Sequence, residues 1–211
     1  TYLCKNVKDN RMTKSGRIEL MAPAGDFTSL QAALDNGADS IYFGVEQLNM
    51  RARASMNFTI LDLPEISKRC KEKGVRTYLT LNTIIYDHDL SIIKTLLDKA
   101  KEADLTAVIA MDQAVIAYAR QIGMEVHIST QINITNIETV RFYSLFADTM
   151  VMSRELSINQ IKKICQQIEK EQIKGPSGNL VEVEIFGHGA LCMAVSGKCY
   201  LSLHSHNSSA N

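Results

Sequence analysis

Val75-Arg-Thr-Tyr-Leu-Thr-Leu81 is an apolar run typical of a buried strand, and Gly74 stands before it where a preceding helix would end. An amphipathic helical pattern covers residues 90–103, and a second apolar run follows at Ala107-Val-Ile-Ala110. Two short buried strands joined through a helix pair in parallel, because the connection crosses back over the sheet. This stretch therefore predicts a parallel sheet covered by helices.

The same strand–loop–helix unit recurs along the chain at intervals of roughly 25 to 35 residues. Strands are predicted at residues 18–22, 40–43, 75–81, 107–110, 125–128, 149–152 and 180–186. Helices are predicted at residues 26–36, 63–73, 90–103, 113–122, 137–146 and 158–171. Residues that favour helix starts are Asp26, Asp62 and Ser157, and glycines that favour helix ends are Gly37, Gly74 and Gly123.

Seven such strands predict an α/β, TIM-barrel-like fold, the (β/α) barrel, over residues 17–211. A complete barrel has eight strands and about 250 residues, whereas this chain has 211 residues. We therefore expect an incomplete barrel. An open doubly wound sheet is the alternative, although no G-x-G-x-x-G turn supports a dinucleotide-binding version. Residues 1–16 are expected to form a polar tail, and residues 174–179 a linker-like insertion.

Composition excludes several classes of protein. The formal net charge is zero, so no overall field attracts the chain to nucleic acid or membrane, and RNA binding would need a local basic patch. No apolar run is long enough to span a bilayer, and no secretory signal opens the sequence. Five cysteines without framework spacing indicate a reducing, cytoplasmic location. Cys4, Cys70 and Cys165 are expected to have no chemical role.

The carboxyl ends of the predicted strands carry small, polar or charged residues throughout, which favours a polar pocket at that edge. They are residues 23–25, Gly44, Asn82, Asp112, residues 127–131, residues 153–155 and residues 187–189. No H-E-x-x-H or G-x-S-x-G motif occurs, so no motif identifies a protease. His188, Asn82 and Gln131 are the catalytic candidates.

Two arginines, Arg51 and Arg53, stand at alternate positions after the second strand, so in an extended segment they point the same way. Their guanidinium groups suit carboxylate or phosphate oxygens, and Arg154 could join them. These three residues are the candidates for substrate binding. Solvated surface arginines are an equally good interpretation of the first two, and Glu155 could neutralise Arg154.

A cysteine-containing segment follows the last predicted strand. His188 and Cys192 share a face if the segment is helical, which allows a weakly supported nucleophile pair. Cys192 and Cys199 are soft ligands of the kind that bind zinc or iron–sulfur centres, and Gly197 could let the chain fold back between them. Their spacing alone favours two reduced cysteines that take no part in metal binding or catalysis.

At this segment the chain resembles the collagenase-like peptidase family. The pattern Glu184-x-Phe186-x-x-Gly189-Ala-Leu-Cys192-x-x-x-x-Gly197-x-Cys199-x-Leu201-Ser202 is similar to that family's signature. Further similarity includes Leu20-Met-Ala-Pro-Ala-Gly25, Gly37-Ala-Asp39, Thr80-Leu-Asn-Thr83, Ser129-Thr-Gln131 and Ser153-Arg-Glu-Leu-Ser157.

The resemblance implies a TIM-barrel-like domain and a site of four cysteines, which in the RNA and quinone hydroxylation members holds a 4Fe-4S cluster. Cys192 and Cys199 match the first two ligands, and the other two would follow Asn211. We therefore expect a C-terminally truncated member that is inactive in this form.

Three functions follow from the resemblance. The first is oxygen-independent hydroxylation of a pyrimidine in tRNA or rRNA, with prephenate as hydroxyl donor. Because prephenate is a dicarboxylate, Arg51, Arg53 and Arg154 are its expected partners. The second is a metal-dependent, collagenase-like protease, and the third is a partner subunit or oligomer component without catalysis of its own. We rank hydroxylation first among these functions, because the sequence contains the soft cysteine ligands and the arginines that it needs.

Overall fold

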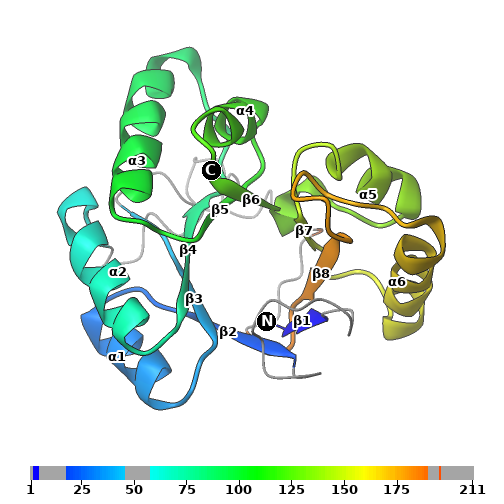
Figure 1. Cartoon of the computed structure of the whole chain (residues 1–211), viewed down its shortest axis with the longest axis horizontal. Coiled ribbons are helices and arrows are strands. Elements are labelled where there is room, and N and C mark those ends of the chain that lie inside the picture. The colour runs from blue at the N-terminus through cyan, green and yellow to red at the C-terminus, as the bar shows by residue number, and fades with distance from the viewer. Residues whose placement is uncertain (1, 5–17, 46–57, 190–194, 196–211) are drawn as a thin grey trace. The chain divides into compact units, whose positions relative to one another are not determined.

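The computed structural model describes residues 2–4, 18–45, 58–189 and 195 (Figure 1). The chain divides into two compact units. The N-terminal unit comprises Leu20–Val126, and the C-terminal unit comprises His127–Ala210 together with Thr1–Glu19.

The N-terminal unit is built from a parallel sheet and helices that alternate with its strands (Figure 1). Neighbouring strands pair in parallel, with Met21 opposite Ser40, Ser40 opposite Arg76, and Tyr78 opposite Ala107. The strands are β2 (Glu19–Pro23), β3 (Ser40–Phe43), β4 (Arg76–Leu81) and β5 (Ala107–Ala110). The helices are α1 (Phe27–Asp35), α2 (Leu63–Glu72), α3 (Leu90–Glu102) and α4 (Gln113–Gln121), with short 3-10 helices η1 (Ile60–Asp62) and η2 (Asp87–Asp89).

The C-terminal unit continues the same alternation. His127 lies opposite Thr149, and Thr149 lies opposite Glu182, so three parallel strands run side by side. These are β6 (Glu125–Ile128), β7 (Thr149–Val151) and β8 (Glu182–Ile185), with helices η3 (Thr130–Ile132), α5 (Ile137–Tyr143) and α6 (Ile158–Glu171). A further strand, β1 (Tyr2–Cys4), pairs antiparallel with β8 and lies within the stretch expected to be a tail.

The predicted fold class is confirmed. Strands β2 to β8 are the seven predicted parallel strands, and they alternate with helices in an α/β, TIM-barrel-like arrangement. Every residue of β5 and of β7 is buried, as expected for strands covered on both faces. Among the described residues, no helix is both long and apolar enough to cross a membrane.

Most predicted helix ends are confirmed. The Asp26 carboxylate accepts a hydrogen bond from the backbone N–H of Ser29, at 2.6 Å, which keeps the pKa of Asp26 below its usual value. Ser157 caps α6 in the same way. The three predicted helix-ending glycines have φ angles of +77°, +68° and +70°. Asp62 stands at the N-cap position of α2 as predicted, but its carboxylate accepts from the Thr59 N–H at 2.7 Å and makes no capping hydrogen bond to α2.

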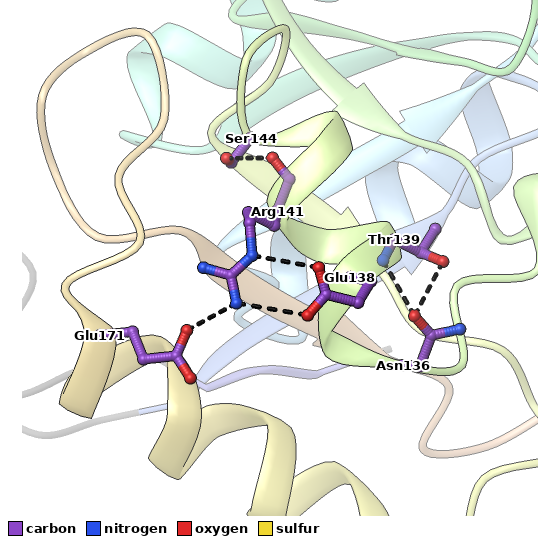
Figure 2. A network of polar contacts seen from close by, with 6 residues as sticks. All are labelled: Asn136, Glu138, Thr139, Arg141, Ser144 and Glu171. Atoms are coloured by element: carbon purple, nitrogen blue, oxygen red, sulfur yellow. Dashed lines mark hydrogen bonds and ion pairs between the residues drawn. The ribbon is translucent and has the colours of Figure 1, made fainter.

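An arginine links the two helices of the C-terminal unit, as Figure 2 shows. The Arg141 guanidinium donates to Glu138 on its own helix α5, at 3.2 Å, and to Glu171 at the end of α6, at 2.7 Å. Nearby, Asn136 caps α5 by accepting from the Thr139 N–H at 2.9 Å. Because these groups are partly exposed, their ion pairs add little to stability.

The predicted linker at residues 174–179 is an ordered turn. Its ends form an antiparallel bridge between Lys174 and Leu180, and the Ser177 hydroxyl donates to the Asp148 carboxylate at 2.6 Å. A Cβ atom at Gly175 would lie 2.8 Å from the Asp148 Cα and 2.9 Å from the Ala147 carbonyl oxygen. Gly175 is therefore required by the close approach of two backbone segments.

We predict that Gly175→Ala lowers the free energy of unfolding by about 3 kcal/mol, because backbone atoms cannot yield to the new methyl group. Gly178→Ala is the matched control: it has open space but a φ of +81°, so it should cost only about 1 kcal/mol. Urea unfolding of both variants measures the difference. Equal losses would show that the close approach at Gly175 is not a constraint.

Candidate functional site

Asp112 ties together two loops at the carboxyl edge of the N-terminal sheet. It follows β5, and its Oδ1 accepts from the Ala114 N–H at 2.8 Å, which caps α4. Its Oδ2 accepts from the Ile85 N–H, at 3.2 Å, in the loop after β4. One carboxylate therefore fixes both the start of a helix and the neighbouring strand's exit loop. Asn82, a catalytic candidate, is half-buried at the first position after β4.

Asp112→Ala should lower the free energy of unfolding by about 1 kcal/mol, since it removes a helix cap and a loop contact. Asp112→Asn retains an acceptor oxygen and is the control, with a smaller loss expected. Chemical denaturation measures both. If the two substitutions cost the same, the hydrogen bonds of Asp112 do not hold these loops.

The carboxyl edge of the C-terminal sheet is held by hydroxyl groups and backbone contacts. Ser129 caps η3 by accepting from the Gln131 N–H at 3.3 Å, and the buried Thr130 hydroxyl donates to the Met152 carbonyl oxygen at 3.4 Å. The Ser153 N–H donates to the Ile134 carbonyl at 3.0 Å. These contacts bind the exit loops of β6 and β7 to each other.

The turn after β7 presents charged groups. The Ser153 hydroxyl donates to the Glu155 carboxylate. Arg154, the substrate-binding candidate between them, is exposed to solvent. Because the guanidinium group is exposed beside a strand end, an anionic ligand can reach it.

A histidine and a glutamate face each other inside the C-terminal unit. His127 on β6 and Glu184 on β8 have side chains only 1% and 4% exposed, and His127 Nδ1 lies 3.8 Å from Glu184 Oε2. That separation suits an ion pair when the imidazole is protonated, but it is longer than a hydrogen bond. Among the described residues, none donates a hydrogen bond to Glu184 Oε2. Such a buried carboxylate depends on the nearby imidazole.

We predict strong coupling between these two residues. His127→Leu and Glu184→Leu should each lower the free energy of unfolding by about 3 kcal/mol, because each leaves a buried polar group behind. The double variant should lose much less than the sum. A double-mutant cycle by denaturant unfolding measures the coupling. Strictly additive losses would show that the residues do not interact.

The strands bring together part of the predicted site. Gln131, Arg154 and His188 follow the carboxyl ends of neighbouring strands β6, β7 and β8 in one unit. Gln131 is half-buried, while His188 is exposed. The roles predicted for these residues and for Asn82 stay predictions. The remaining candidates, Arg51, Arg53, Cys192 and Cys199, lie outside the described residues.

Two described cysteines, Cys70 and Cys165, lie outside the cysteine-containing motif. Burial raises the pKa of the Cys70 thiol to about 11. Cys165 is half-buried in α6. In the part of the chain that the structure describes, no three His, Cys, Asp or Glu side chains gather closely enough to hold a metal ion.

The family model "Peptidase family U32" matches residues 25–211. The chain belongs to this family. It is 56% identical over 193 residues to "Collagenase" of Porphyromonas gingivalis, a match that covers 92% of this chain and 47% of the relative.

Two further relatives have names that refer to RNA. "tRNA hydroxylation protein P1" of Bacillus subtilis is 31% identical, over 88% of this chain and 42% of that protein. "23S rRNA 5-hydroxycytidine C2501 synthase" of Escherichia coli is 32% identical, over 93% of this chain and 28% of that protein. The chain thus spans less than half the length of each of these three relatives.

Proposed function

We propose that this chain is the barrel-like part of an enzyme that hydroxylates a pyrimidine in tRNA or rRNA without molecular oxygen. The observation that carries the proposal is the similarity to relatives named for RNA hydroxylation, which extends over 88% and 93% of the chain. That similarity includes the strands whose carboxyl ends bear Asn82, Gln131 and Arg154. Such an enzyme would act in the cytoplasm, where these RNAs are.

The polar strand ends of each unit carry groups that suit such a substrate. Amides such as those of Asn82 and Gln131 can both donate and accept hydrogen bonds, which suits the edge of a pyrimidine. The exposed Arg154 suits a carboxylate or phosphate oxygen. Together with Arg51 and Arg53, it would bind the two carboxylates of prephenate, the proposed hydroxyl donor.

Cys192 and Cys199 are proposed as two of four thiolate ligands of a 4Fe-4S cluster. The chemistry of the pair fits, because such clusters are held by cysteine thiolates. Residues of the full-length protein beyond Asn211 would supply the other two ligands. A cluster of this kind supplies one-electron redox chemistry when bound.

The cluster is tested in the full-length protein, purified anaerobically. We predict that Cys192→Ala and Cys199→Ala each reduce iron content and visible absorption at least ~10-fold. Cys165→Ala is the matched control, because Cys165 lies in α6 outside the motif and should leave both signals unchanged. Full iron content in both motif variants would overturn the cluster assignment.

The reaction is tested in cells. A deletion strain should lack one hydroxypyrimidine nucleoside in tRNA or rRNA, as measured by mass spectrometry, and the full-length gene should restore it. Unchanged hydroxypyrimidine levels in the deletion strain would overturn the RNA reaction whatever the result for iron.

A second candidate function is a collagenase-like protease. The observation that favours it is the 56% identity to a relative named "Collagenase". Gelatin cleavage by the purified full-length protein, abolished by His188→Ala or Cys192→Ala, would support this candidate. Gelatin that stays intact while the RNA modification is restored would exclude it.

A further inference from the structure

The loop after β4 presents two aromatic rings to solvent. Tyr86 is 59% exposed, and the side chain of His88 is 80% exposed. The rings are almost parallel, with an interplanar angle of 6° and centroids 5.7 Å apart. This is an offset stacked pair. Ile84 in the same loop is also 45% exposed.

Several hydrogen bonds hold the loop that carries the rings. The Ile85 N–H donates to Asp112 at 3.2 Å, and the Tyr86 N–H donates to Asp89 at 3.1 Å. The Asp89 N–H donates back to the Tyr86 carbonyl oxygen at 2.8 Å, and Thr83 is buried at the base of the loop. The backbone that carries the rings is therefore held in place before any ligand binds.

The position of the pair favours a role in binding. The loop leaves the carboxyl end of β4, and in TIM-barrel-like folds the loops at that end of the strands form the functional site. Tyrosine and histidine are among the side chains on which unpaired RNA bases stack, and such stacking tolerates any base. A planar, prearranged pair offers that surface at little cost in side-chain ordering.

Charge determines which part of RNA could contact the pair. Asp87 and Asp89 flank His88, so a phosphate group would be repelled here. A base has no such charge and can approach the ring face. The contact should therefore be insensitive to salt, unlike a lysine or arginine contact to phosphate.

We propose that Tyr86 and His88 form a stacking platform for an unpaired base of the RNA substrate. This inference rests on the proposed function, because it assumes that RNA is the substrate. It assigns a part of the N-terminal unit to recognition of a single-stranded segment, such as a loop, next to the pyrimidine that reacts.

The test uses the full-length protein and two probes, unmodified tRNA and a single-stranded oligopyrimidine ribonucleotide that contains one 2-aminopurine. Tyr86→Leu keeps apolar bulk but removes the aromatic face, and it should weaken binding about tenfold. Tyr86→Phe keeps the ring and should bind within about twofold of wild type. His88→Ala should weaken binding less than Tyr86→Leu. The slope of affinity against salt should stay unchanged in all variants.

Any of the following results would overturn the proposed stacking platform. If wild type binds RNA and restores the modification but Tyr86→Leu binds equally well, the platform is wrong while the proposed function stands. If Tyr86→Leu loses binding to a gelatin peptide and not to RNA, the rings serve a protein ligand. If wild type neither binds the probes nor restores the modification in cells, the proposed function fails and the platform fails with it.

Discussion

Parallel pairing of short buried strands is the constraint on which the rest of the structure depends. A parallel strand cannot turn back directly, so each strand must be followed by a helix that returns the chain along the sheet. Strands such as β5 and β7 are buried at every residue, which requires cover on both faces. Because the strands are parallel, the chain leaves every strand of one sheet at the same edge. Functional residues that are distant in the sequence can therefore become neighbours at that edge.

In each unit, the exit loops at the carboxyl edge of the strands are held in place by a few polar groups. Asp112 in the N-terminal unit and Ser129, Thr130 and Ser153 in the C-terminal unit each bond to backbone of their own or a neighbouring loop. Those bonds leave half-buried Gln131 and exposed Arg154 at fixed places beside the strand ends. The buried His127–Glu184 pair connects β6 and β8 beneath the same edge. A rigid scaffold with polar loops suits chemistry that needs an oriented substrate.

Much of the fold could be predicted because its signals are local. Alternation of apolar strands and amphipathic helices can be recognised within a window of a dozen residues, and Gly37, Gly74 and Gly123 mark the helix ends. Asp62 was predicted as a cap, but Thr59 just upstream offers its carboxylate a competing donor. The turn at residues 174–179 was predicted as a linker, because its anchor Asp148 is remote in sequence.

The site was less predictable, since it depends on contacts between strands. Glu184 lies in the cysteine-containing motif and His127 in the polar stretch at residues 127–131, but their pairing follows from the register of β6, β7 and β8 and not from their spacing. The available signal was a histidine and a glutamate that each stand between two apolar residues of a strand. The stacked rings of Tyr86 and His88 likewise depend on the turn formed by η2. Family membership, in contrast, was indicated correctly by the cysteine-containing motif.

Hydrogen–deuterium exchange of the full-length protein with and without its RNA tests the central claim most directly. If RNA binds at the carboxyl ends of the strands, exchange should slow in residues 82–89, 129–133, 153–157 and 186–189. Loops at the opposite ends, such as residues 36–39, 73–75 and 122–124, should not change. Slower exchange at those opposite loops alone, or no change anywhere with RNA in excess, would contradict the account.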